Sequence, residues 1–195
     1  MKQSLFRKLT YIKLSQVKLT GAVLDVGGVK DAEYHKIING KSVFTTANID
    51  ESTHPDILID LEGSRLPIEN ETYDSVILIN LLEHIYNYNF LIKESSRILK
   101  QNGKIVIVVP FLYYVHSSPN DYFRYTKQAL EMIMKENSFD QIKIEEIGCG
   151  AFSASANLIH RFFPSFVNLV IEKIAVLFDK LVIFISKILK KIYVN

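Results

Sequence analysis

Three aspartates in the first half of this sequence accompany short apolar runs, and each offers two carboxylate oxygens to a polar ligand. Asp25 stands just before Gly27 and Gly28, while Asp50 and Asp60 belong to the next two apolar runs. Because glycine has no Cβ, a pair of glycines lets the backbone turn sharply and lets a ligand approach it closely. The pattern predicts that acids beside a glycine turn recognise a polar small molecule.

The positions of these acids match the groups of a nucleoside that carries an ammonium. Asp50, at the end of a second strand, can accept both hydroxyls of a ribose, because two acceptor oxygens match a cis-diol. Asp60, with Leu61 beside it, could receive an adenine amine, and Asp25 could hold an ammonium directly or through water. Lys30 replaces the third glycine of the dinucleotide-binding pattern, which argues against a pyrophosphate. Ribose, adenine and ammonium together describe S-adenosylmethionine.

A polar and aromatic segment, residues 116–126, holds further reactive side chains. His116 and Asp121 are acid/base types, and a methyl acceptor must lose a proton. The segment follows an apolar run, so it should lie over the ligand. In the alternative interpretation, Asp121 pairs with Arg124 only to fix the loop. His84 is expected to order the start of a helix. The histidines expected to be surface or packing residues are His35, His54 and His160.

These candidates depend on an alternation of strands and helices. The runs expected to be strands are residues 23–26, 43–49, 57–61, 75–79, 104–109 and 141–147. The segments expected to be helices are residues 31–38, 90–99 and 126–136, the last capped by Thr126. This rhythm predicts an α/β fold, with a mainly parallel sheet covered on both faces. The carboxyl ends of the strands then bring the three aspartates and residues 80–84 to one edge.

The C-terminal segment has a different composition. Residues 158–194 are helix-compatible and broken only by Pro164, and charges recur at sevens from Glu172 onward. Such a helix has a narrow polar stripe and a wide apolar face. Its longest charge-free stretch near the end, Leu181–Ser186, is far shorter than the roughly 20 residues of a membrane span. We therefore expect it to lie on a surface. Expected boundaries are a basic helical segment at 1–20, a domain at 21–150 and a helical extension at 151–195.

The charge distribution and the single cysteine limit the kinds of partner and ligand that we expect for this protein. Basic residues without acids occupy residues 1–24 and 180–195, although the net charge is only +2, so the middle is acidic. Basic ends predict contact with an anionic surface, with solvated helix ends as the alternative. One cysteine excludes an internal disulfide and a cysteine-based zinc site, and no metal is expected. The N-terminal charges leave no signal-peptide core, which predicts a cytoplasmic protein, with the inner face of the membrane as the surface for its tail.

Several motifs in order resemble a family. They are Val-Leu-Asp-Val-Gly-Gly (23–28), Ala-Asn-Ile-Asp (47–50), Asp-Leu-Glu-Gly-Ser-Arg-Leu-Pro (60–67), Tyr-Asp-Ser-Val-Ile-Leu (73–78), Leu-Leu-Glu-His-Ile (81–85), Arg-Ile-Leu-Lys-Gln-Asn-Gly-Lys (97–104) and Val-Val-Pro-Phe (108–111). Together they resemble the class I S-adenosylmethionine-dependent methyltransferases of the small type-11 group over residues 20–148.

The resemblance implies a Rossmann-like, doubly wound sheet of six or seven strands, with residues 181–185 as a candidate for the seventh. It implies that Gly27 and Gly28 pass under the methionyl part of the cofactor, and that Asn80 and Leu81 line the methyl-donor side. The segment at 116–126 is similar to a loop of small methyltransferases encoded among surface-glycan genes. The implied acceptor is an oxygen or nitrogen of a small molecule, a sugar or a lipid-linked glycan.

Two other function classes compete with this hypothesis. A non-catalytic protein with the same fold could bind a membrane or partner through its helical tail, although three intact strand-end acids argue against it. Methylation of nucleic acid is disfavoured because the basic residues lie at the termini and not in the acidic body. No nucleic-acid partner is therefore expected. A homodimer that pairs two tails is the rival to membrane contact.

Overall fold

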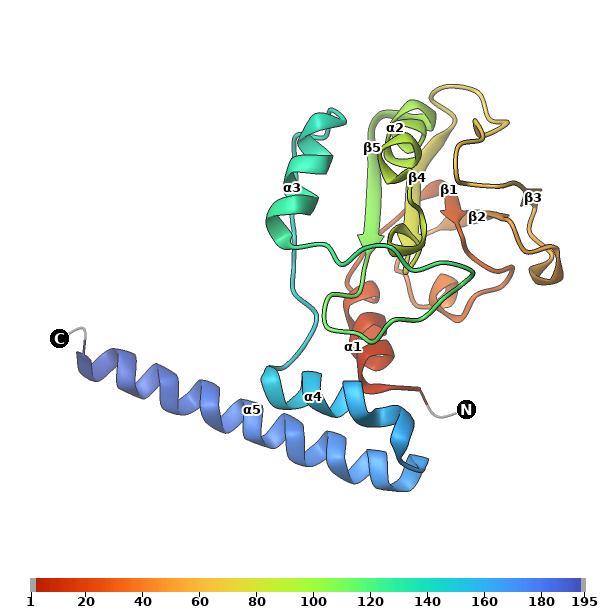
Figure 1. Ribbon diagram of the computed structural model, residues 1–195. Helices are drawn as coiled ribbons and strands as arrows, with labels where there is room; N and C mark the ends of the chain where they lie inside the picture. Colours follow the sequence, from red (N-terminus) through yellow and green to blue (C-terminus); the bar gives the residue numbers. More distant parts are fainter. Residues whose placement is uncertain (1–2, 194–195) are drawn as a thin grey trace. The chain divides into compact units, whose positions relative to one another are not determined.

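The computed structural model describes residues 3–193 and contains two compact units (Figure 1). The sheet unit comprises residues 14–111 and 115–145. The terminal unit combines the described part of the N-terminal segment with residues 112–114 and the chain from residue 146 onward. Each unit has its own pattern of burial, so they are described separately.

The sheet unit contains five described strands, all parallel. They are β1 (Gly21–Val26), β2 (Ser42–Asn48), β3 (Ile57–Leu58), β4 (Tyr73–Ile79) and β5 (Leu99–Val108). Their order is β3-β2-β1-β4-β5, so the chain builds outward from β1 in one direction and then in the other. The expected mainly parallel sheet is confirmed. The order reverses between β1 and β4, and open sheets of this kind bind ligands at the carboxyl ends beside such a reversal.

Apolar side chains of the strands form the core together with two helices. Leu24 and Val26 of β1 and Val76 and Leu78 of β4 are fully buried, as the two-residue period of a strand predicts for one face. The helices that join this core are α2 (Tyr88–Ile98) and α3 (Lys127–Glu136). Thr126 caps α3 as expected, because its hydroxyl accepts a hydrogen bond from Ala129 N at 3.1 Å.

The expected number of strands, six or seven, was wrong. Residues 141–147 are extended but pair with no strand of the described chain, and residues 181–185 lie inside a helix. The physical reason is shared: a strand needs a neighbour for its backbone groups, and the chain after residue 150 is helical and supplies none.

The helix expected at residues 31–38 is only the 3-10 turn η1 (Glu33–Lys36). Asp31 before it is left-handed, at φ 58°, and no side chain caps η1. A segment this short cannot compensate for helix nucleation, and two of its polar side chains instead turn toward a buried aspartate described below.

The terminal unit is helical. Its helices are α1 (Leu5–Leu14, of which Leu14 falls in the sheet unit), α4 (Ala151–Ile159), the 3-10 helix η4 (His160–Phe162) and α5 (Ser165–Tyr193). Pro164 separates η4 from α5, as expected. Among the described residues, none of the helices is both long enough and apolar enough to span a bilayer.

The face that α5 buries is polar. Its most buried residues are Asn168, Glu172, Ala175 and Asp179, spaced at helical intervals, and α5 packs on α4. Large apolar side chains of the same helix, including Leu177 and Phe184, are exposed. The acids of the predicted polar stripe, Glu172 and Asp179, therefore face inward, whereas its lysines, Lys173, Lys180 and Lys187, are exposed.

Candidate active site

The glycine turn after β1 lies where only glycine fits. Gly27 has φ 78°, and its N–H donates to Ala47 O of β2 at 2.7 Å. A Cβ at Gly27 would lie 2.6 Å from the Leu81 side chain, and one at Gly28 would lie 2.0 Å from the Asp25 carboxylate. The two glycines thus allow Leu81, just after β4, to approach the end of β1. The structure brings these predicted residues together.

Asp25 is fully buried below this turn. Its Oδ2 accepts hydrogen bonds from the Tyr34 hydroxyl at 2.8 Å and from His35 Nε2 at 2.7 Å. Burial raises the pKa of Asp25, and these two bonds oppose that rise. Its Oδ1 has no hydrogen-bond partner within the described chain, so one buried oxygen remains for a ligand. His35, expected to be a surface or packing residue, therefore has a polar role, and its ring also stacks on Phe44.

Asn48 fastens the glycine turn and was not singled out from the sequence. Its Nδ2 donates to the carbonyl oxygens of Gly27 at 3.0 Å and Gly28 at 2.9 Å. Its Oδ1 accepts from Asp50 N at 3.0 Å. One amide therefore sets the turn after β1 and the start of the loop after β2. Its position within the Ala-Asn-Ile-Asp motif was the available signal.

Asp50 and Asp60 stand exposed after β2 and β3. Asp50 Oδ1 accepts from the Ser52 hydroxyl at 2.6 Å and from Ser52 N at 2.9 Å, and these bonds lower the pKa of Asp50. Asp60 Oδ1 accepts from Glu62 N at 3.0 Å. Leu61 packs its side chain into the core at 5% exposure, so only its backbone could meet a ligand.

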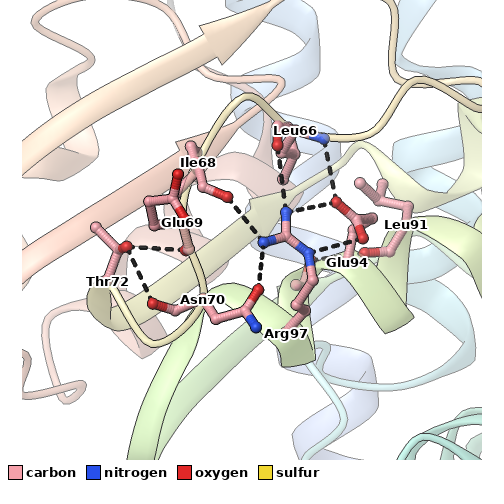
Figure 2. Close-up of polar contacts among 9 residues, drawn as sticks. Leu66, Ile68, Glu69, Asn70, Thr72, Leu91, Glu94 and Arg97 are labelled. Carbon is pink, nitrogen blue, oxygen red and sulfur yellow. Dashed lines mark hydrogen bonds and ion pairs between the residues drawn. The ribbon is translucent and has the colours of Figure 1, made fainter.

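The loop that carries Asp60 and Leu61 is tied to α2 by a partly buried ion pair (Figure 2). Arg97 donates to Glu94 through Nε at 2.9 Å and Nη2 at 2.7 Å. The same guanidinium donates to the carbonyl oxygens of Leu66 at 3.2 Å and Ile68 at 2.8 Å. Glu94 Oε2 also accepts from Leu66 N at 3.1 Å. The ion pair therefore binds the loop in two ways: Arg97 donates to its carbonyl oxygens, and Glu94 accepts from one of its N–H groups.

Asn80 opens the segment after β4 with a left-handed backbone, at φ 51°. Its N–H donates to Val108 O at the end of β5 at 2.8 Å, and its side chain is exposed. Asn80 and Leu81 thus stand at the carboxyl edge between β1 and β5, where the sequence predicts the methyl-donor side.

Asp121 is the anchor of the loop at 116–126. Its side chain is 2% exposed, and it accepts from Arg124 Nη1 at 2.6 Å and Nη2 at 2.8 Å. It also accepts from His116 N at 2.8 Å, and its Oδ2 lies 3.4 Å from His116 Nδ1. The Arg124 guanidinium holds the pKa of Asp121 well below its usual range, with His116 N acting in the same direction. A carboxylate with these partners is a poor proton acceptor, but it can fix the position of His116.

A second carboxylate and a second histidine stand beside this pair, in the 3-10 helix η3 (Leu82–His84). Glu83 is fully buried, and neither of its carboxylate oxygens has a hydrogen-bond partner in the described chain. His84 Nε2 lies 3.6 Å from Glu83 Oε1, and the His84 and His116 rings meet edge to face at 4.9 Å. Burial raises the pKa of Glu83, which His84 and Arg124 oppose. Glu83 was not named as a site residue from the sequence, although the Leu-Leu-Glu-His-Ile motif contains it.

The main chain of η3 holds the reactive loop in place. Glu83 O accepts from Tyr122 N at 2.8 Å, and Leu82 O accepts from the Tyr125 hydroxyl at 3.1 Å. His84 Nδ1 contacts the Asn120 carbonyl oxygen. His84, expected to order a helix start, therefore also secures the loop after β5.

Comparison with known proteins agrees with this architecture. Residues 39–107 match the family described as "Methyltransferase domain". A 44-residue segment is 48% identical to an uncharacterized protein of Methanocaldococcus jannaschii and spans 19% of that relative's length and 23% of this chain.

Solved structures share the fold at low identity. A SAM-dependent methyltransferase from Archaeoglobus fulgidus superposes with a TM-score of 0.55 and 17% identity, covering 87% of this chain and 86% of that chain. The [4+2]-cyclase SpnF gives 0.59 and 14% identity, with coverages of 80% and 64%. Phosphoethanolamine N-methyltransferase 2 of Haemonchus contortus, in complex with S-adenosyl-L-methionine, gives 0.55 and 16%, with coverages of 71% and 38%. Part of this chain therefore matches a methyltransferase domain, and these solved structures share its fold.

Proposed function

We propose that this protein transfers a methyl group from S-adenosylmethionine to an oxygen or nitrogen of a small-molecule, sugar or lipid-linked glycan acceptor. The observation that carries the proposal is the glycine turn with a buried, half-satisfied Asp25 beneath it, at the point where the strand order reverses. A glycine turn that lets other groups approach its backbone closely, and a buried acid with one oxygen unpaired, both suit a ligand that carries an ammonium.

The cofactor residues follow from the positions of the strand ends. In this proposal Gly27 and Gly28 lie under the methionyl part, and Asp25 receives the ammonium. The residues proposed for the remaining groups are Asp50 for the ribose, Asp60 and Leu61 for the adenine, and Asn80 and Leu81 for the methyl-donor side. When bound, S-adenosylmethionine supplies an electrophilic methyl group; the chain supplies binding and orientation.

Calorimetry tests this part directly. Asp50→Ala should weaken cofactor binding measurably, because a charge-assisted hydrogen bond to the ribose is lost. Asp140→Ala, an exposed acid outside the strand ends, serves as the matched control. Unchanged affinity in Asp50→Ala, or no binding to the parent chain at millimolar cofactor, would show that the site is wrongly assigned.

For the acceptor, we assign His116 as the group that takes the acceptor proton. Asp121 and Arg124 act behind it: the carboxylate orients the imidazole, and the guanidinium keeps the carboxylate charged. Mass spectrometry of glycans, lipids and metabolites from cells with and without the protein would identify the acceptor by its added methyl mass. A chain that binds the cofactor yet methylates nothing would favour the non-catalytic alternative.

A second proposal concerns the terminal unit: α5 docks on an anionic membrane surface from the cytoplasmic side. The observation that favours it is the inverted burial of α5, whose outward face carries Phe166, Leu177 and Phe184 at 61–71% exposure. An apolar face of this length is more than soluble surfaces usually leave in water. The exposed lysines on the same helix are Lys173, Lys180 and Lys187, and they suit anionic headgroups.

Sedimentation with anionic liposomes separates the membrane from a dimer. The full chain should co-sediment at low salt and less at high salt, and Leu177→Glu with Phe184→Glu should abolish the effect. Met132→Glu makes the same change at an exposed site of α3, at 62% exposure, and should bind like the parent. Self-association that depends on Leu177 and Phe184, without liposome binding at any salt concentration, would favour the homodimer instead.

A further inference from the structure

We infer that Glu83, His84 and His116 form a binding site for one divalent transition-metal ion. The site belongs to the sheet unit and joins η3, just after β4, to the loop after β5. One carboxylate oxygen and one ring nitrogen from each histidine lie within 4.8 Å of one another. Two imidazoles with one carboxylate form a ligand set of catalytic zinc and of other divalent first-row metals.

The distances between the candidate ligand atoms already suit one metal ion. Two ligand atoms that each lie about 2.1 Å from a tetrahedral metal are separated by about 3.4 Å. His84 Nε2 and Glu83 Oε1 are 3.6 Å apart, longer than a hydrogen bond and close to that edge length. A small inward movement would therefore complete coordination without rebuilding the loop.

The hydrogen bonds of His84 prepare the correct nitrogen. The Asn120 carbonyl can only accept, so His84 Nδ1 carries the proton and donates it there. The lone pair of the neutral ring then lies on Nε2, the nitrogen that faces Glu83. Metal-binding histidines are typically oriented by such a bond from their other nitrogen, and Asp121 stands in a similar relation to His116 Nδ1, at 3.4 Å.

Glu83 gives the second, independent argument. Its side chain is fully buried, and both carboxylate oxygens lack a hydrogen-bond partner among the described residues. A buried carboxylate without hydrogen bonds is unfavourable unless a cation or a proton compensates it. The charge of nearby Arg124 acts on Glu83 from a distance, but Arg124 donates no hydrogen bond to it, and its Nη1 and Nη2 both bind Asp121. A metal ion would satisfy Glu83 and draw on both histidines at once.

Three protein ligands leave coordination positions open, which distinguishes a catalytic from a structural site. If the methyltransferase proposal holds, an open position would receive the acceptor oxygen or nitrogen and lower its pKa. With the ion bound, His116 would be a ligand and the acceptor proton would pass to solvent; the role of His116 as proton acceptor applies to the chain without the ion. Metal binding itself does not depend on the methyltransferase function, and it can be measured without cofactor or acceptor.

The test uses the full chain after treatment with a chelator. Titration with Co²⁺, followed by visible absorption, and with Zn²⁺, followed by calorimetry, should show one ion bound per chain. Glu83→Gln keeps the shape of the side chain and should weaken binding by more than about 100-fold, since even the loss of an orienting partner costs about 10–100-fold. His116→Asn, in the loop, should do the same.

His54→Asn is the matched control, because His54 is an exposed histidine of the same unit with a left-handed backbone that asparagine tolerates. It should bind both ions like the parent. Circular dichroism verifies folding, and His116→Asn decides the question if Glu83→Gln does not fold. No binding of either ion to the folded parent, or unchanged affinity in the folded ligand variants, would overturn the inference. Cofactor calorimetry on the same sample shows separately whether the methyltransferase proposal fails.

Discussion

The sheet unit and the terminal unit bury opposite kinds of side chain. In the sheet unit Val26 and Leu78 are fully buried, and Asp25, Asp50 and Asp60 lie at or just after the carboxyl ends of strands. In the terminal unit α5 buries Glu172 and Asp179 and exposes Phe184. The difference shows that one chain combines a self-contained core with a helix whose apolar face lacks a partner in the described chain. A core stabilises the first, whereas we propose that the apolar face of the second docks on a membrane surface.

Polar contacts hold α5 within the terminal unit. Asp179 accepts from Phe152 N at 2.9 Å and Ser153 N at 2.8 Å, so a side chain of α5 caps the first turn of α4. Gly150 permits this, because a Cβ there would lie 2.4 Å from Asp179 Oδ1. Glu172 Oε2 accepts from Lys8 Nζ of α1 at 3.1 Å. Each buried acid therefore has partners, which explains how a polar face can pack inward.

The largest expected effect lies in the sheet unit. His116→Ala should lower turnover on an identified acceptor by about 10²–10⁴-fold, the usual contribution of a proton-transferring group. Steady-state kinetics would measure it, with cofactor affinity as the readout that should not change. His54→Ala is the control. Full turnover in His116→Ala would mean that the loop is only a lid.

The next largest effect is expected from the ion pair in Figure 2, which should stabilise the sheet unit. Arg97→Ala leaves Glu94 buried without its cation and frees the carbonyl oxygens of Leu66 and Ile68. We expect a loss of about 3 kcal/mol in the free energy of unfolding, measured by urea denaturation. Lys93→Ala, one turn earlier on an exposed face of α2, should change it little. Equal effects of the two substitutions would contradict the role of the pair.

A smaller effect is expected in the terminal unit. Asp179→Ala removes both acceptors from the start of α4 and should destabilise that helix by about 2 kcal/mol. Hydrogen exchange at the Phe152 and Ser153 amides would measure the change, and strand amides of the sheet unit should exchange as before. If the strands respond equally, the two units unfold together and the contrast between them is weaker than we propose.

The smallest expected effect is on the pH dependence of the stability of α4. Burial alone would raise the pKa of Asp179, but hydrogen bonds from Ser153 and Phe152 outweigh it and lower the pKa from 3.8. A lowered pKa contributes stability that is complete above the unfolded value and is lost as the pH falls through the folded one. Protection of the α4 amides should therefore decline below about pH 4. Asp179→Asn should remove this decline.

Several elements could be predicted from the sequence because their signals are local. The continuous apolar runs of β1, β4 and β5, the capping Thr126 of α3 and the seven-residue spacing of charges along α5 depend on neighbouring residues alone. The acids at strand ends were found in the same way, since a parallel sheet places the ends of its strands at one edge. Their proposed ligands remain predictions.

The tertiary structure alone decided which distant residues meet. Asp25 pairs with His35, Asn48 clamps the glycine turn, and Glu83 lies beside His116 only because the sheet order and the loop after β5 bring them together. The same holds for the missing sixth strand, which depends on a neighbour that the helical C-terminal part does not provide. The spacing along α5 predicted a polar stripe, but the inward direction of its acids depends on the first turn of α4, whose N–H groups bind Asp179. Periodicity defines the faces of a helix, whereas the groups packed against it decide which face is buried.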